Sequence, residues 1–245
     1  MRGLAASAMK EAIWTQSQAI TSYLVNFQRR LSLPGLLALF QEMAWNHAEH
    51  SGHGYSMITG HSHAWVLARQ RIEVDRWPDW NEVVELRTWL RPPRGLLVFR
   101  DFEIVGCARG VGTWMSIDTV SRQPRAPQLG EANFLVAGHH PFQPVRIEPF
   151  AVSEGVARFA VRPGDLDLNG HVNNLSFAQW ILDSLPMSVH RTYQLESYEV
   201  NFLAEVCEGD AVVVQHGARG LFQGWRESDR KIVFTAQLSS SSSSS

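Results

Sequence analysis

The chain has 245 residues, with 22 Lys plus Arg against 24 Asp plus Glu, so its formal net charge at pH 7 is −2. Its hydrophobic share of 44% is ordinary for a globular protein. Without an excess of positive charge, the chain lacks the broad basic surface of a nucleic-acid binder. The two cysteines, Cys107 and Cys207, form no Cys-x-x-Cys pair. They indicate neither a disulfide framework nor a cysteine zinc site, and they favour a reducing compartment.

The two ends of the chain indicate neither a membrane anchor nor an exported protein. No stretch approaches the roughly 20 apolar residues that span a bilayer. Lys10 and Glu11 interrupt the N-terminal apolar run before the core of a signal peptide could form. We therefore expect a cytoplasmic protein without a membrane span. Residues 239–245 are all serine, and we expect a disordered tail or an artefact outside the fold.

The first half predicts one helix followed by an antiparallel meander. Residues 13–25 are rich in β-branched and aromatic residues and predict a strand. A helix is predicted from Pro34 to about Gly52, because apolar residues recur there at helical spacing. Four strand-like runs separated by turn residues come next, at 64–74, 82–90, 95–105 and 111–120.

The second half repeats this order of elements. It predicts strands and one helix at 155–162, 175–185 (the helix), 195–203, 210–219 and 231–238. Residues 72–75 (IEVD) resemble residues 198–201 (YEVN), and each tetrapeptide follows a helix by one loop. We expect two α+β repeats, 1–138 and 139–238, each an antiparallel sheet wrapped around a central helix.

The segment DLDLNGHVNN carries the groups with chemical potential. Asp167, Asn169 and His171 stand two residues apart, so an extended chain would project all three to one side, with Leu166 and Leu168 on the other. A helix follows at once. Its first backbone N–H groups, within 171–174, form a positive end that can stabilise an oxyanion.

A purely structural interpretation of this segment is equally open on local pattern alone. Asn169 or Asn173 would cap the helix, and Asp167 would lie in a solvated turn.

The sequence resembles a known family. DLDLNGHVNNLSFAQWIL is similar to the motif with which acyl-ACP thioesterases introduce the helix of their second hotdog repeat. Further landmarks of that family occur in order in the first half: Gln41-Glu42, Ala44, Asn46-His47, Trp65-Val66-Leu67, Trp77-Pro78, Thr88-Trp89, Arg100-Asp101-Phe102 and Trp114. The resemblance covers roughly residues 14–238 and implies a tandem, or double, hotdog fold.

The resemblance also implies a catalytic set and a reaction. It makes Asp167, Asn169 and His171 catalytic in the hydrolysis of a thioester, without a serine nucleophile and without a cofactor. Plant members carry a Glu a few residues along the strand after the helix, and we match that position to Asn201. Since Asn cannot act as a base, we assign water activation to Asp167, with His171 or Glu199 as alternatives, and we assign the carbonyl oxygen to Asn169 and a helix N–H.

Substrate-binding residues are expected in the first half. Phe40, Met43 and Trp65 are expected to line an acyl-chain pocket together with Leu36 and Met57, although the same composition is typical of an ordinary core.

Two charged or titratable clusters accompany this pocket. Arg91 and Arg94, with Arg87 and Arg100, are expected to offer a basic patch to a phosphopantetheine phosphate or an acidic carrier protein, unless they form a solvated face. The histidines at 47, 50, 53, 61 and 63 permit a metal site, which we do not expect because helix-end histidines usually bond locally.

The resulting hypothesis is an acyl-ACP thioesterase that releases a free fatty acid. Alternatives are an acyl-CoA thioesterase, a dehydratase of the same fold, and a non-catalytic module that binds or senses acyl thioesters. The partner would be an acyl carrier protein or a CoA thioester, not a nucleic acid. The protein would be a monomer or a homodimer.

Overall fold

The structure is a computed structural model that describes residues 12–51, 63–127, 129, 136, 138–151, 154–192 and 194–241. The chain forms two compact units, Met1–Pro144 and Val145–Ser245. The division falls a few residues after the expected boundary at Gly138, because His140 and Phe142 are bound to the sheet of unit 1 through Arg91.

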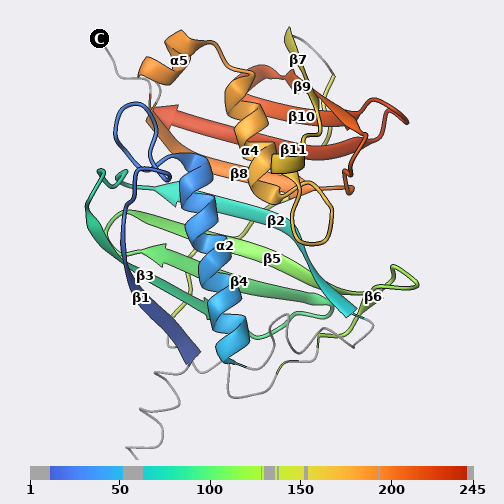
Figure 1. Cartoon of the computed structure of the whole chain (residues 1–245). Helices are drawn as coiled ribbons and strands as arrows, with labels where there is room; N and C mark the ends of the chain where they lie inside the picture. The colour runs from blue at the N-terminus through green and yellow to red at the C-terminus, as the bar shows by residue number, and fades with distance from the viewer. Residues whose placement is uncertain are drawn as a thin grey trace, which may run out of the picture. The chain divides into compact units, whose positions relative to one another are not determined.

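Within the described residues, unit 1 is an antiparallel sheet of five main strands and one short strand, with the long helix α2 (Figure 1). The strands lie in the order β1-β3-β4-β5-β2, and a short strand β6 pairs with β5. Helix α2 runs across one face of this sheet. The elements are β1 (Ile13–Ala19), α2 (Leu33–His50), β2 (His63–Val74), β3 (Val83–Leu90), β4 (Leu97–Ile104), β5 (Ala108–Asp118) and β6 (Pro124–Arg125).

The helix α2 forms where the sequence predicts it. Ser32 is its N-cap and accepts a hydrogen bond from the N–H of Gly35, and Pro34 occupies the first turn. Phe40, on its buried face, stacks on Phe102 of β4 with ring centroids 4.8 Å apart. The strand expected over 13–25 is wrong beyond Ala19, where the chain turns away from the sheet edge.

Unit 2 repeats the topology of unit 1. Its strands lie in the order β7-β9-β10-β11-β8, which matches β1-β3-β4-β5-β2 position for position. The predicted repeat is therefore confirmed. The elements are β7 (Glu154–Ala160), η2 (Pro163–Asp165), α4 (Asn174–Asp183), α5 (Met187–Thr192), β8 (Gln194–Phe202), β9 (Ala211–His216), η3 (Ala218–Gly220), β10 (Leu221–Arg226) and β11 (Ile232–Ser241).

Helix α4 packs on the sheet of unit 2 through aromatic side chains. Phe177 contacts Phe202 and Phe234, with ring centroids 5.6 and 5.4 Å away. Strand β11 continues into the serine tract, where Ser239 pairs with Ser197 of β8. The expectation that the tract lies outside the fold is therefore wrong for its first three residues, up to Ser241. Among the described residues, no helix combines the length and apolarity needed to cross a membrane.

Candidate active site

The segment between η2 and α4 is a tight turn organised by the Asp167 side chain. Asp167 Oδ1 accepts hydrogen bonds from the N–H groups of Asn169 (2.8 Å) and His171 (3.1 Å). The N–H of Asp167 donates to the carbonyl of His171 at 2.7 Å, and Gly170 takes a positive φ of 74° that suits glycine. The extended conformation expected for this segment is therefore wrong, and the segment forms a turn instead, as the structural interpretation of Asp167 allowed.

Exposure in this turn also differs from the expected alternation. Leu168 is 80% exposed, so it does not anchor the segment. Leu166 does, through a β-bridge to Val172. Asn169 lies exposed, while Asp167 and His171 are half-buried. The turn thus presents an amide to solvent beside a carboxylate and an imidazole that are partly shielded from it.

Helix α4 begins immediately after this turn with Asn173 as its N-cap. The Asn173 side chain accepts from the N–H of Leu175 at 3.0 Å, as the structural interpretation expected. The N–H groups of His171, Val172 and Asn173 are all bound within unit 2. Of the four N–H groups expected at this positive end, only that of Asn174 has no acceptor among the described residues, so it can still bind an oxyanion.

A second carboxylate joins the turn from the loop between β8 and β9. Glu205 Oε2 lies 3.8 Å from His171 Nε2. The backbone supports this approach, since the N–H of Val172 donates to the carbonyl of Val206 at 2.8 Å and His171 forms a bridge with Cys207. The turn and the loop are therefore in contact, and we call Asp167, Asn169 and His171 of the turn and Glu205 of the loop the cluster of unit 2.

Asn201, expected in the catalytic set, is wrong for that role. It is 1% exposed, its Oδ1 accepts from the N–H of Ile147 at 2.9 Å, and its Nδ2 donates to the carbonyl of Val145 at 2.9 Å. Its neighbour Phe202 contacts helix α4, so strand alternation turns Asn201 toward the opposite face. Glu199 lies on that same face and accepts from the N–H of Val145.

Glu205 is a candidate site residue that the sequence analysis missed. The resemblance pointed to a Glu after the helix of the second repeat, and we sought it within the strand. A carboxylate four residues farther along, just beyond the end of β8, was the available signal.

Unit 1 contains the residues expected to bind the acyl chain. Phe40 and Met43 are buried between α2 and the sheet, and Trp65 is half-buried on β2. Their burial suits both a core and a pocket wall, so the acyl pocket stays a prediction. Met57, also expected there, lies outside the described residues.

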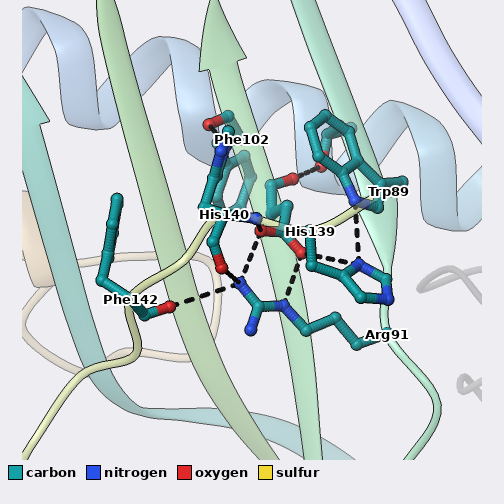
Figure 2. A network of polar contacts seen from close by, with 8 residues as sticks. Trp89, Arg91, Phe102, His139, His140 and Phe142 are labelled. Carbon is teal, nitrogen blue, oxygen red and sulfur yellow. Dashed lines mark hydrogen bonds and ion pairs between the residues drawn. The ribbon is translucent and has the colours of Figure 1, made fainter. Parts of the chain in front are cut away.

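Arg91 does not belong to a surface patch. Its Nε and Nη2 donate to the two carboxylate oxygens of Asp101, at 2.6 Å each, and Asp101 is fully buried. Figure 2 shows Arg91 Nη2 also donating to the carbonyls of His140 (3.1 Å) and Phe142 (3.4 Å). Beside this pair, His139 Nδ1 accepts from the indole N–H of Trp89. Arg91 is therefore an interior ion-pair partner, and its predicted contact with a carrier protein is wrong.

The other three arginines of the expected patch differ among themselves. Arg100 is also buried, and burial lowers the pKa of its guanidinium to about 9. Its Nη1 lies 2.8 Å from Nδ1 of His47. Arg87 pairs with acidic neighbours, Glu85 above all. Arg94 is exposed, with its guanidinium over the ring of Phe99. Among these four arginines, Arg94 is exposed without an ion pair to a described residue, and its contact with a phosphate or a carrier protein stays a prediction.

Metal ligands were not expected, and no group of three or more potential ligands occurs within the described part of the chain. His47 is committed to the interior contact with Arg100. His53, His61 and the side chain of His63 lie outside the described residues.

Comparison with known families adds two matches that together span most of the chain. A family model for the acyl-ACP thioesterase N-terminal domain matches residues 11–127, and one for the acyl-ACP thioesterase C-terminal domain matches residues 151–244.

Curated relatives are plant enzymes. The oleoyl-acyl carrier protein thioesterase 2 of Arabidopsis thaliana (chloroplastic) is 26% identical over 219 residues, which cover 79% of this chain and 59% of the relative. The dodecanoyl-[acyl-carrier-protein] hydrolase of Umbellularia californica (chloroplastic) is 25% identical over 224 residues, 82% of this chain and 58% of the relative. The chain thus spans somewhat under three fifths of the length of these relatives.

Solved structures share the fold. An acyl-ACP thioesterase from Bacteroides thetaiotaomicron superposes with a TM-score of 0.82 at 22% identity, covering 95% of this chain and 99% of the other. A 12:0-ACP thioesterase from Umbellularia californica gives a TM-score of 0.78 at 20% identity, covering 94% and 97%. With the repeated sheet-and-helix topology, these likenesses confirm the double hotdog fold.

Proposed function

Since the chain belongs to the acyl-ACP thioesterase family, we propose that it hydrolyses the thioester of acyl-[acyl carrier protein] to a free fatty acid and the holo-carrier protein. The observation that carries this proposal is the cluster in unit 2. The turn that carries Asp167, Asn169 and His171 leads directly into helix α4, and the carboxylate of Glu205 lies 3.8 Å from the His171 imidazole. These are the groups that activate water and stabilise an oxyanion.

Asp167 is the group that we assign to water activation. Its Oδ1 is committed to two backbone N–H groups, which fix the orientation of the carboxylate. Its Oδ2 accepts no hydrogen bond from the described residues, so it is available to a water molecule. The proton leaves the water for this oxygen as the water oxygen bonds to the acyl carbon.

The remaining members of the cluster serve the carbonyl and the leaving group. Asn169 Nδ2 and the N–H of Asn174 stabilise the oxyanion of the tetrahedral intermediate. When this intermediate collapses, the carbon–sulfur bond breaks. The sulfur leaves as a thiolate, whose thiol has a pKa of roughly 8.5, and it takes the proton that the carboxylate accepted. His171, held beside Glu205, orients the leaving sulfur and passes that proton.

The acyl chain and the carrier protein are assigned to unit 1. We place the acyl chain between α2 and the sheet, against Phe40, Met43 and Trp65, because Phe40 and Met43 are buried apolar side chains of α2. Arg94, exposed at the turn between β3 and β4, is the group that we assign to the phosphopantetheine phosphate or an acidic carrier surface.

A cytoplasmic location and a monomeric or homodimeric state complete the proposal. Both cysteines are free thiols, as in proteins of reducing compartments. Both units lie in one chain, which suits a monomer, while β1 and β7, each paired on one side within its own unit, offer edges for a homodimer.

The test is thiol release from matched panels of acyl-ACP and acyl-CoA of several chain lengths, with the fatty acid identified by mass spectrometry. We expect turnover on both panels with a higher kcat/KM on acyl-ACP. A higher kcat/KM on acyl-CoA would instead identify CoA, not the carrier protein, as the donor of the acyl group. Saturable binding of acyl-ACP without release of thiol would identify a binding module and contradict hydrolysis.

A further inference from the structure

The loop between β8 and β9, residues 203–210, holds Glu205 at the cluster. Within the loop, the N–H of Cys207 donates to Asp210 Oδ2 at 3.0 Å, and the N–H of Asp210 donates to the carbonyl of Cys207 at 3.2 Å. These bonds close the far end of the loop. Glu205 lies at the near end, just beyond β8, between Ala204, whose N–H donates to the carbonyl of Val233 at 3.2 Å, and Val206, whose carbonyl accepts from the N–H of Val172.

One side chain from outside the loop binds the backbone at Glu205. Arg226, at the end of β10, donates from Nη1 to the carbonyl oxygen of Glu205 at 2.8 Å. The same nitrogen lies 3.8 Å from Asp210 Oδ2, the acceptor that closes the loop. A single guanidinium therefore reaches both ends of the loop.

Arg226 is itself held in place. Its Nε and Nη2 donate to the two carboxylate oxygens of Asp229, at 3.1 and 2.5 Å, and Asp229 also accepts from the N–H of Lys231. Its backbone pairs with Val212 of β9. Only a planar guanidinium can bind the carboxylate with two nitrogens and still direct a third toward a carbonyl.

We propose that Arg226 is a positioning residue for hydrolysis: by binding the carbonyl oxygen of Glu205, it fixes the Glu205 carboxylate beside His171. The inference rests on the proposed function, because it gives Glu205 a part in the reaction. Arg226 touches neither substrate nor reacting atoms in this scheme. Its effect is geometric, and a displacement of about 1 Å at a catalytic group can cost about 10²-fold in rate.

Unit 2 offers a matched control for the loss of an arginine ion pair. Arg158 on β7 binds Glu227 with Nε at 3.0 Å and Nη2 at 2.7 Å, a pairing as complete as that of Arg226 with Asp229. No contact joins Arg158 to the described residues of the 203–210 loop. Arg158→Met therefore removes a comparable ion pair without touching Glu205.

The experiment compares Arg226→Met, Arg158→Met, Glu205→Gln and the double variant Arg226→Met/Glu205→Gln on one acyl-ACP, with melting temperatures for all. We expect Arg226→Met to lower kcat by about 10²-fold at little change in KM, and Arg158→Met to retain the wild-type kcat. In the Glu205→Gln background, Arg226→Met should lower kcat hardly any further, because Arg226 acts through the Glu205 carboxylate, which this background lacks.

Two further variants keep the test informative if Arg226→Met folds poorly. Arg226→Lys preserves the charge but cannot bind the carbonyl and the carboxylate together, so we expect it to recover part of the lost kcat. Asp229→Asn leaves the bond to Glu205 and loosens its support, so a smaller loss of kcat is expected. Neither substitution removes the side chain.

Three results would overturn the inference, and they are distinguishable from failure of the proposed function. If Glu205→Gln is impaired while Arg226→Met matches Arg158→Met, Arg226 has no positioning role. If the losses multiply in the double variant, Arg226 acts independently of Glu205. If Glu205→Gln has the wild-type kcat, Glu205 has no part in hydrolysis. Absence of turnover by the wild-type protein on every donor would instead contradict the proposed function itself.

Discussion

Two arginines buried in unit 1 differ in what surrounds their charge. Arg91 has a bidentate partner in the fully buried Asp101. Arg100 has His47 and the hydroxyl of Thr88 as its hydrogen-bond partners, and its pKa is lowered to about 9 by burial. A buried pair loses most when one charge is left alone, whereas a buried charge without a carboxylate partner adds little to stability.

We therefore predict that Arg91→Met and Arg100→Met have unequal effects on the free energy of unfolding. Arg91→Met leaves Asp101 buried without its counter-charge and should destabilise unit 1 by about 3–5 kcal/mol. Arg100→Met removes a desolvated charge and should change stability by less than about 1 kcal/mol. Urea unfolding of both variants at pH 7 measures the difference, and equal losses would contradict this account.

His216 gives unit 2 a pH dependence of known sign. Burial lowers the pKa of His216, whose Nε2 lies 2.7 Å from Ser184 Oγ. The unfolded chain binds this proton near pH 6.5, but the folded chain binds it only at lower pH. The stability contributed by the neutral imidazole is therefore complete above about pH 6.5 and is lost as the pH falls through the folded pKa.

The test compares melting temperatures of the wild type and His216→Gln between pH 8 and pH 5. The variant lacks the titrating group, so the advantage of the wild type should shrink as the pH falls. A difference that stays constant with pH would show that His216 does not titrate with folding.

Among the elements, strand β10 (Leu221–Arg226) was not predicted from the sequence, and its glycine explains why. Strand β10 contains Gly224, a residue that weakens a strand pattern. A Cβ placed on Gly224 would lie 2.1 Å from Cε1 of Phe234, its neighbour on β11. The ring of Phe234 fills that space and also packs on Phe177 of α4, so glycine is required.

We predict that Gly224→Ala destabilises unit 2 by about 1–3 kcal/mol, because the new methyl group displaces the Phe234 ring. Gly164→Ala is the control, since a Cβ there has nothing within 4 Å. Thermal or urea unfolding measures both. Adding Phe234→Leu to Gly224→Ala should recover part of the loss, and the absence of any recovery would place the strain elsewhere.

Most elements followed from periodicity, and the catalytic segment did so only in part. Amphipathic spacing located α2 and α4, and β-branched runs located most strands, because burial on one face leaves a pattern in the sequence. The turn at Asp167 has no periodicity, since it depends on a side-chain oxygen that accepts from the N–H groups of Asn169 and His171, and only the structural interpretation of the segment included it. Asn201 was misassigned because alternation does not reveal which face carries the site and which binds the segment after Pro144.

At the scale of the whole molecule, the two units share a topology and differ in chemistry. Unit 2 carries the titratable cluster around Asp167, and unit 1 carries the apolar helix–sheet layer around Phe40. The chain is held on both sides of their boundary. In unit 1, Arg91 donates to the carbonyl of His140. In unit 2, Asn201 accepts from the N–H of Ile147 and Gln223 accepts from the N–H of Phe150. The proposed function assigns the acyl chain to the sheet of unit 1 and hydrolysis to unit 2.

This division predicts that a substitution in unit 1 changes chain-length preference without abolishing the reaction. Met43 is fully buried between α2 and the sheet, and Met43→Phe should shorten the pocket and move the preferred acyl chain to a shorter length. Met187→Phe, at an exposed position of α5, is the matched control. Relative kcat/KM across the acyl-ACP panel measures the shift, and an unchanged profile would place the acyl chain elsewhere.

Under the proposed function, the cluster of unit 2 hydrolyses the thioester through Asp167. The most direct test is the rate of thiol release from the preferred acyl-ACP by the wild type and by Asp167→Asn. The variant keeps an oxygen that can accept the N–H groups of Asn169 and His171, so the turn should persist. We predict a loss of about 10²–10⁴-fold in kcat with the melting temperature nearly unchanged. A folded Asp167→Asn protein with the wild-type rate would contradict the assignment.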